Sequence, residues 1–344
     1  MERLSDTGRR IRAWMGFAGA PPIAVVILLL AYGADVPAQD RNSRIAFTSM
    51  RDGDREIYVM RPDGTGLRNL TRNPAMDVVP MWSPTRRRLA FWSTRDGDNA
   101  LYTMKADGSD VRKLLTMPPD TGGRLAWSPD GKRFAFTSKR DGNYRVYVMD
   151  ADGGGQRRIT KDVDTWATGV AWSPDSRRVG FTSNREGPRL IFETAADGQI
   201  RDPKRLTTVG GVEEYPAWSP DGRRLAFMSR RRDLFHKDVW ISDIGGAHAR
   251  NLMPDPDGER ETDADRPAWS PDGRQIAYGS EFPGGLELDI VIMSVEAPDP
   301  TALTEHPARD GNPVWFDPRG LAASPLHSRL TTWGWMKQLD ADPR

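Results

Sequence analysis

The stretch WSPDGKRFAFTSKRDGNYRVYVMDADG, from Trp127 to Gly153, recurs along the chain in closely related forms. Each copy opens on an apolar segment that ends in tryptophan, and a turn and further apolar segments follow. Successive openings are 45, 45, 46 and 51 residues apart. The five openings lie at Trp82, Trp127, Trp172, Trp218 and Trp269. A period of this length indicates a repeat architecture in which each copy is one structural unit.

One copy divides into four short segments with the composition of β-strands. They are Leu125–Ser128, Arg133–Ser138, Tyr144–Asp150 and Gln156–Thr160. The Ser-Pro-Asp-Gly between the first two favours a tight turn, because proline presets its backbone angle and glycine accepts a positive φ. Helical periodicity is absent, so each unit predicts a four-stranded antiparallel meander.

A single sheet of this kind cannot bury its two faces, whereas sheets stacked face to face around an axis bury both. The sequence therefore predicts an all-β fold, a six-bladed β-propeller of four-stranded antiparallel blades. Five blades are complete, and the sixth combines residues 44–71 with a degenerate opening at Trp315. We expect this C-terminal strand to pair with the N-terminal blade, which leaves no long open edge. We also expect the opening tryptophans to pack between adjacent blades.

The segments WSPDGRRLAF, from Trp218 to Phe227, and SKRDGNYRVYVMDADG with the RRIT that follows resemble the TolB-like β-propeller repeat. The resemblance covers about residues 44–318. It implies a periplasmic propeller that docks other envelope proteins on one face. TolB proper carries an α/β domain before its propeller, and too few residues separate Ala38 from Arg44 for one here. The resemblance therefore implies docking in general rather than the Tol–Pal role.

Composition excludes several classes of protein. The 344 residues carry a net charge of +1, and their cations are spread through all repeats, which argues against a nucleic-acid partner. Cysteine is absent, which excludes disulfides, thiolate metal sites and a cysteine nucleophile. A hydrophobic content of 38% fits a globular chain rather than a disordered one.

Residues 1–38 differ from the repeats. Arginines at positions 9, 10 and 12 precede an apolar run at 23–32, and Val36 and Ala38 are small residues before a cleavage point. This order predicts a secretory signal peptide and a periplasmic or secreted protein. The alternative is an uncleaved membrane anchor formed by residues 18–32. The propeller is then expected over residues 39–318, followed by a C-terminal strap or tail over residues 319–344.

Carboxylates precede several opening strands, in DVVPMW, EEYPAW, DRPAW and DGNPVW. They are Asp77, Glu213, Glu214, Asp265 and Asp310. If the opening strands are innermost, these residues form an acidic rim at one mouth of the central channel. A docking ring for basic side chains, or a cation site, is the functional interpretation. The alternative is that each carboxylate bonds the backbone at its own strand end. Two blades have no acid here, so the rim is incomplete.

The sequence contains no nucleophile elbow, no phosphate-binding glycine loop and no histidine pair at ligand spacing. We therefore predict no catalytic residues, no metal site and no cofactor. The acidic run 255–265 departs from a calcium loop, because Gly258 takes the fourth position instead of the sixth, and we interpret the run as a solvated insert. The repeated Arg-Asp-Gly indicates turn chemistry, with side chains expected to bridge neighbouring blades.

A non-enzymatic interaction module of the cell envelope is the favoured function. Its partner is expected to be an envelope protein with a basic contact surface, bound in a salt-sensitive way. The chain is expected to be a monomer that contacts the membrane only through an uncleaved N-terminal segment. Alternatives are a propeller that binds a small ligand, glycan or metal, with Tyr215 and Trp166 as candidate aromatics, and a propeller hydrolase or lyase, with His236 and the acidic rim as candidates.

Overall fold

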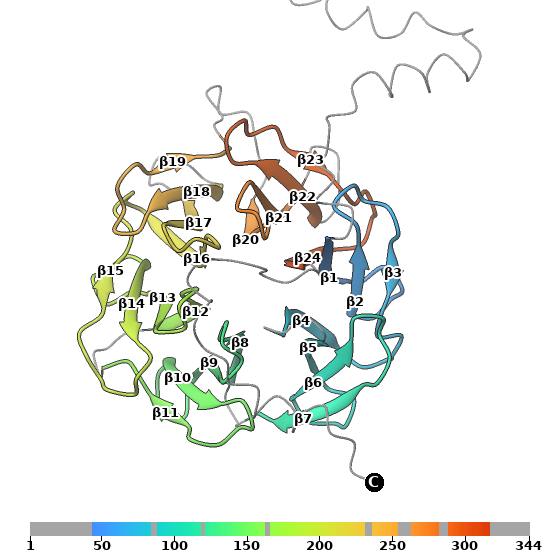
Figure 1. Cartoon of the computed structure of the whole chain (residues 1–344), viewed down its shortest axis with the longest axis horizontal. Helices are drawn as coiled ribbons and strands as arrows, with labels where there is room; N and C mark the ends of the chain where they lie inside the picture. The colour runs from blue at the N-terminus through green and yellow to red at the C-terminus, as the bar shows by residue number, and fades with distance from the viewer. Residues whose placement is uncertain are drawn as a thin grey trace, which may run out of the picture. The chain divides into compact units, whose positions relative to one another are not determined.

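The structure is a computed structural model that describes residues 43–83, 88–117, 121–161, 166–230, 236–253, 263–281 and 288–316, without the side chains of residues 122–124 and 281. Within these ranges the chain forms 24 β-strands arranged as six four-stranded sheets. The sheets surround one axis as the blades of a propeller (Figure 1). No helix with the length and hydropathy that a membrane crossing requires occurs in these ranges.

The strands of each blade are given from the innermost outward. Blade 1 contains β24 (Asp310–Phe316), β1 (Arg44–Ser49), β2 (Glu56–Met60) and β3 (Arg68–Asn69). Blade 2 contains β4 (Asp77–Trp82), β5 (Arg88–Ser93), β6 (Ala100–Lys105) and β7 (Arg112–Thr116). Blade 3 contains β8 (Thr121–Trp127), β9 (Arg133–Ser138), β10 (Arg145–Asp150) and β11 (Arg157–Arg158).

The other three blades follow the same order. Blade 4 contains β12 (Ala167–Trp172), β13 (Arg178–Ser183), β14 (Leu190–Ala195) and β15 (Lys204–Arg205). Blade 5 contains β16 (Val212–Trp218), β17 (Arg224–Arg230), β18 (Asp238–Asp243) and β19 (Arg250–Asn251). Blade 6 contains β20 (Ala264–Trp269), β21 (Gln275–Glu281), β22 (Leu288–Ser294) and β23 (Thr301–Ala302).

The predicted closure of the ring is confirmed. Strand β24 pairs antiparallel with β1, with Arg44 opposite Phe316 and Ser49 opposite Asp310. The innermost strand of blade 1 therefore comes from the far end of the described chain (Figure 1). This arrangement satisfies the backbone of both terminal strands and leaves no unpaired strand between the first and last blades.

The opening tryptophans lie between blades. Trp172 belongs to one apolar cluster with Ala135 and Val146 of the preceding blade, and its indole N–H donates to the Ala126 carbonyl at 3.0 Å. Trp218 packs so closely on Gly180 of the preceding blade that a Cβ there would lie 2.2 Å from the indole. Large aromatic side chains therefore supply much of the apolar contact that joins successive blades.

The Ser-Pro-Asp-Gly turns also join neighbouring blades. The Ser128 hydroxyl donates to Asp130 at 2.6 Å, and the Asp130 N–H donates to the Ser176 hydroxyl of the next blade at 2.9 Å. Ser176 replaces the turn glycine and adopts its left-handed conformation, with φ of 58°. The arginine after a turn reaches forward too, since the Arg133 guanidinium carbon lies 4.8 Å from the centre of the Trp172 ring.

The two ends of the blades differ. At one end, the loop face, the innermost strands begin and the second and third strands are joined by hairpins. At the other end, the turn face, lie the Ser-Pro-Asp-Gly turns and the hairpins between the third and fourth strands. The loop face gathers the connections that differ most between blades, and such connections are where propellers place specific functions.

Each innermost strand whose conformation is described there bulges three residues before its tryptophan. At this position the backbone is left-handed, with φ between 51° and 63°. The bulge residues are Val79, Gly169, Tyr215, Arg266 and Asn312. Strand pairing shifts register at the same place, for example between Glu214 and Ala217. Bulges of this kind redirect a side chain relative to a regular strand.

Candidate functional site

Two carboxylates of the predicted acidic rim occupy the same place in blades 1 and 2, five residues before the tryptophan. Asp77 accepts from the Arg95 guanidinium at 2.9 Å, and Asp310 accepts from Arg51 at 2.6 Å. Both carboxylates are fully buried. Burial raises the pKa of each above its ordinary range, and the neighbouring arginine and hydroxyl donors offset this only in part.

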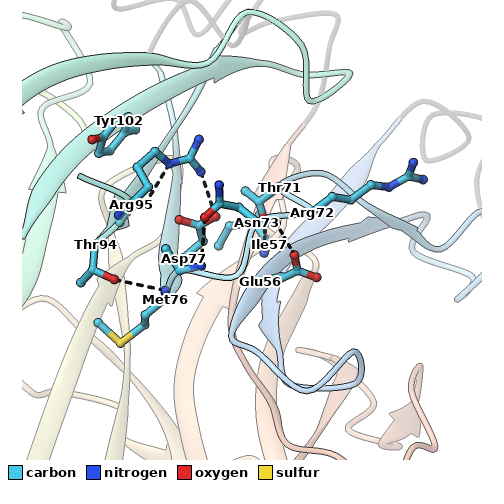
Figure 2. A network of polar contacts seen from close by, with 12 residues as sticks. Glu56, Ile57, Thr71, Arg72, Asn73, Met76, Asp77, Thr94, Arg95 and Tyr102 are labelled. Carbon is cyan, nitrogen blue, oxygen red and sulfur yellow. Dashed lines mark hydrogen bonds and ion pairs between the residues drawn. The ribbon is translucent and has the colours of Figure 1, made fainter. Parts of the chain in front are cut away.

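Figure 2 shows the surroundings of Asp77, where Arg95 turns back from its hairpin to meet the carboxylate. The connection that leads into β4 is held by further bonds, since the Asn73 N–H donates to Glu56 at 2.7 Å and the Met76 N–H donates to the Thr94 hydroxyl at 3.2 Å. Asp77 therefore lies among polar contacts that fix the start of the innermost strand.

Glu213 occupies the equivalent place in blade 5, with other partners. The Thr207 hydroxyl donates to one of its oxygens, and the Gly210 N–H donates to the other at 2.9 Å. The side chain is fully buried, and burial raises its pKa above the ordinary range of glutamate. Here the carboxylate serves the backbone and hydroxyl groups of the loop that leads into β16.

Glu214 and Asp265 stand one residue further along. Glu214 is 3% exposed and lies 2.6 Å from Arg189 and 3.5 Å from Lys237. The Asp265 carboxylate lies 3.5 Å from the Arg266 guanidinium, with 22% of its side chain exposed. The fold thus brings all five predicted carboxylates to the loop face of the innermost strands. Four of them are buried, so Asp265 alone among the five offers appreciable surface to a partner.

The Arg-Asp-Gly hairpins have a structural role within single blades. The Arg140 guanidinium carbon lies 4.7 Å from the centre of the Tyr147 ring, and the Tyr147 hydroxyl donates to Asp141 at 2.6 Å. The same pairs recur in blades 1 and 2, where Tyr58 donates to Asp52 and Tyr102 donates to Asp96. These contacts join strands of one blade, so the expectation that the Arg-Asp side chains bridge neighbouring blades was wrong.

A row of cationic and aromatic side chains, with one glutamate, crosses the loop face from blade 3 to blade 5. It consists of Lys139, Tyr144, Trp166, Arg189, Glu214 and Lys237, here called the aromatic–cation row. The Lys139 ammonium lies 4.7 Å from the centre of the Tyr144 ring, which meets the Trp166 ring edge to face at 6.1 Å. The Arg189 guanidinium carbon lies 5.4 Å from the centre of the Trp166 ring. Glu214 then joins Arg189 to Lys237.

Sequence reasoning singled out Trp166 but missed the row around it. The indole is 36% exposed, which is unusual for a side chain of this size. Its neighbours come from three blades, and no local sequence pattern links them. The only signal in the sequence is that Trp166 lies just before an innermost strand, where the loop face is expected.

The bulge residues form a second group, at the inner rim of the loop face. The Arg266 guanidinium carbon lies 5.5 Å from the centre of the Tyr215 ring on the preceding innermost strand. The Arg266 Nε and the Asn312 Oδ1 are both buried and have no hydrogen-bond partner among the described residues. A proline follows each of Val79, Tyr215, Arg266 and Asn312. These prolines are a local signal from which the bulges could have been predicted, because proline within a sheet is confined to strand starts, edge strands and bulges.

Within the described ranges, no group of three or more acidic, histidine or cysteine side chains is placed to hold a metal ion. The His236 Nε2 lies 3.7 Å from the Asp238 carboxylate. Most of the acidic run 255–265, the segment 1–38 and the tail 319–344 lie outside the described residues.

Comparison with known proteins agrees with the fold. A solved TolB from Acinetobacter baumannii is 24% identical with a TM-score of 0.68, over 86% of this chain and 71% of that chain. A putative TolB from Agrobacterium tumefaciens is 22% identical with a TM-score of 0.59, over 76% of this chain and 88% of that one.

Other solved propellers are similar too. An oligogalacturonate lyase from Vibrio parahaemolyticus is 17% identical with a TM-score of 0.52, over 78% of this chain and 76% of that one. At such identities these structures show a shared fold and nothing more specific. A search of curated protein sequences gave no match.

The family comparison is more specific. The model of the TolB beta propeller domain matches residues 37–120 and 118–264, which is more than half of the chain. Those residues contain four of the five Trp-Ser-Pro openings, the Arg-Asp-Gly hairpins and most of the described blades. The chain belongs to the TolB beta propeller domain family.

Proposed function

We propose that the chain is a non-enzymatic interaction module of the cell envelope, and that it docks a protein partner on its loop face. The aromatic–cation row is the observation that carries this proposal. It places an exposed tryptophan, a tyrosine and an arginine, the residue types that most often dominate binding energy, in one continuous group.

The row is suited to docking because its side chains are already held in place. Arg189 is fixed from one side by Glu214 and from the other by the Trp166 ring. Tyr144 contacts the edge of the same indole. A partner that covers Trp166 would thus meet a surface that loses little side-chain freedom on binding, and such preorganisation strengthens association.

The chemistry of the partner follows from the groups on this face. The sequence-based expectation of a basic partner depends on the acidic rim, and in that rim Asp265 keeps accessible surface. The row presents Lys139, Arg189 and Lys237 beside the indole. We therefore propose a partner whose contact includes an apolar or aromatic group for Trp166 and charged groups around it, with an association that weakens as salt rises.

The location and form of the protein belong to the same proposal. The envelope location is supported by the signal peptide predicted for residues 1–38 and by the similarity to TolB propellers. The propeller is proposed to act as a monomer, because β24 already completes the edge of blade 1 and removes an open strand through which copies could pair.

Site-specific photo-crosslinking in cells tests the proposal. A photoreactive phenylalanine analogue replaces Trp166 in one strain and Ile200 in a second. Both residues are exposed apolar side chains, and Ile200 lies in the hairpin between β14 and β15 on the turn face. We expect a defined protein adduct at position 166 that is absent at position 200 and weakened by Arg189→Gln. Equal capture at both positions, or no adduct at position 166, would contradict the proposal.

A further inference from the structure

We propose that Arg266, together with Tyr215 and Asn312, forms a binding site for a carboxylate group at the inner rim of the loop face. The three residues hold the same position in three consecutive innermost strands, β16, β20 and β24. The site is distinct from the aromatic–cation row, and no side chain is shared between the two.

The backbone at these positions is shaped in an unusual way. Tyr215, Arg266 and Asn312 have φ of 57°, 51° and 56°, in the left-handed region that residues with a Cβ rarely adopt. The bulge turns their side chains away from the regular alternation of the strand. Such strained positions are maintained where the surrounding structure enforces them, and they concentrate at binding sites.

Gly169 shows how the side chains are arranged around the rim. A Cβ at Gly169 would lie 3.5 Å from the Tyr215 ring, so Tyr215 extends over the bulge residue of the preceding strand. Arg266 extends over the preceding strand in the same way, and its guanidinium carbon lies 5.5 Å from the centre of the Tyr215 ring. The tyrosine face therefore supports one face of the guanidinium and leaves its edge to bind another group.

Two polar side-chain atoms of this group have no hydrogen-bond partner among the described residues. The Arg266 Nε is buried and makes no hydrogen bond within the described residues, although it forms an ion pair with the Asp265 carboxylate at 3.5 Å. The Asn312 Oδ1 is also buried without a partner among the described residues. Buried polar atoms are nearly always hydrogen-bonded in folded proteins, so two unmade bonds on neighbouring strands indicate a place where another polar molecule binds.

A carboxylate is the group that fits. The guanidinium is planar and presents parallel N–H donors that match the two oxygens of a carboxylate. The Asn312 amide adds a hydrogen bond to the same ligand when its Nδ2 group faces the site, because only the amide N–H groups can donate to a carboxylate and the O and N positions of an asparagine amide can be exchanged. The other described side chains at bulge positions are Val79 and Gly169, which carry no polar group. The ligand is therefore anchored on the β16–β24 side of the rim.

Two sources supply this chemistry, a small organic acid and the terminal carboxylate of a peptide. Isothermal titration of the purified propeller at constant ionic strength distinguishes them. One arm uses sodium acetate and sodium citrate. The other uses a pentapeptide of alanine and glycine with a free C-terminus and the same peptide with a C-terminal amide.

We expect saturable binding with a Kd of roughly 1 mM or tighter in at least one arm, and no binding of the amide. Arg266→Gln should weaken that binding at least about 10-fold, and Arg266→Lys should do nearly the same, because lysine keeps the charge but loses the paired donors. Arg309→Gln removes an exposed arginine from the same face and should leave the affinity unchanged.

Each variant is first checked for an unaltered tryptophan fluorescence spectrum and thermal midpoint. If Arg266→Gln is unstable, Asn312→Ala provides the second test, with an expected loss of about threefold or more. Absence of saturable binding in every arm, or equal affinity in Arg266→Gln and Arg309→Gln, would overturn the proposal. Trp166→Ala should bind the carboxylate normally, so this result is independent of the docking test.

Discussion

The pair Asp310 and Arg51 gives a sharp prediction, because its two members should respond differently to mutation. Asp310 is fully buried, whereas Arg51 keeps 11% of its side chain exposed and lies over the Tyr58 ring at 4.8 Å. The pKa of Asp310 is raised, and desolvation is the largest cause, ahead of the favourable charge of Arg51. The carboxylate is therefore the member of the pair whose charge is costly to bury.

Replacing the arginine should be the harmful change. Arg51→Met keeps most of the apolar stem but leaves a buried carboxylate without its cation, and such a break costs about 3–5 kcal/mol. Asp310→Asn keeps the shape and removes the desolvated charge, and it should cost within about 1 kcal/mol at pH 7, since neutral replacements of buried ions are often tolerated. The thermal midpoint of the arginine variant should lie roughly 5–9 °C below that of the wild type, because the entropy of unfolding grows with chain length.

The assay is denaturation in guanidinium chloride and by heat, monitored by tryptophan fluorescence at pH 7 and at pH 5. A raised folded-state pKa means that the stabilising contribution is present at low pH and lost as pH rises through the folded pKa. The deficit of Arg51→Met should therefore shrink on acidification. The equivalent pair in blade 2 provides a second test of the same reasoning. Arg95→Met should lose stability as Arg51→Met does, and Asp77→Asn should be tolerated as Asp310→Asn is. An Asp310→Asn variant that loses as much stability as Arg51→Met at pH 7 would refute the reasoning.

Three further predictions concern single contacts. Gly180→Ala should destabilise the protein by about 1–3 kcal/mol, because the new Cβ would overlap the Trp218 indole, and denaturant midpoints measure the loss; an unchanged midpoint would show that the indole can move freely. Glu213→Gln should be at least as stable as the wild type at pH 7. Because the pKa of Glu213 is raised, part of the wild-type stability should decline as pH rises above about 4.5, and this decline should be missing in Glu213→Gln; parallel pH profiles of the two proteins would contradict this. Burial and the Asp141 carboxylate raise the pKa of Tyr147 to about 12, so its stabilising contribution should persist above the ordinary tyrosine pKa of 10 and be lost near pH 12. Absorbance at 295 nm should show one fewer late-titrating tyrosine in Tyr147→Phe, and titration of Tyr147 near pH 10 would be the opposite result.

The elements of each blade could be read from the chain because their signals are local. The expected strand Arg133–Ser138 has the bounds of β9, and Tyr144–Asp150 differs from β10 by one residue. The fourth strand was expected at Gln156–Thr160 and is the two-residue β11 at Arg157–Arg158. An outermost strand pairs on one side only, so its length is decided by the neighbouring strand rather than by its own residues.

The burial of the carboxylates could not be predicted from the sequence. Their place at one end of the innermost strands followed from the repeat, but their burial did not. Whether Asp77 faces a partner or a partly buried arginine depends on the position of Arg95, which comes from the hairpin that follows β5. The row from Lys139 to Lys237 joins side chains of three blades, and sequence spacing carries no information on such contacts.

What the sequence alone determined is the repeated unit, the number of blades and the closure of the ring, because each follows from short-range turn chemistry and a period counted along the chain. What only the tertiary structure decided is which polar groups are satisfied and which are left without partners. The burial of Asp310 and the unmade bonds of Arg266 both depend on neighbouring strands that are distant in sequence. Local residue preferences determine where the strands form. The balance between desolvation and pairing at each charged group depends on contacts between strands and blades that are distant in sequence.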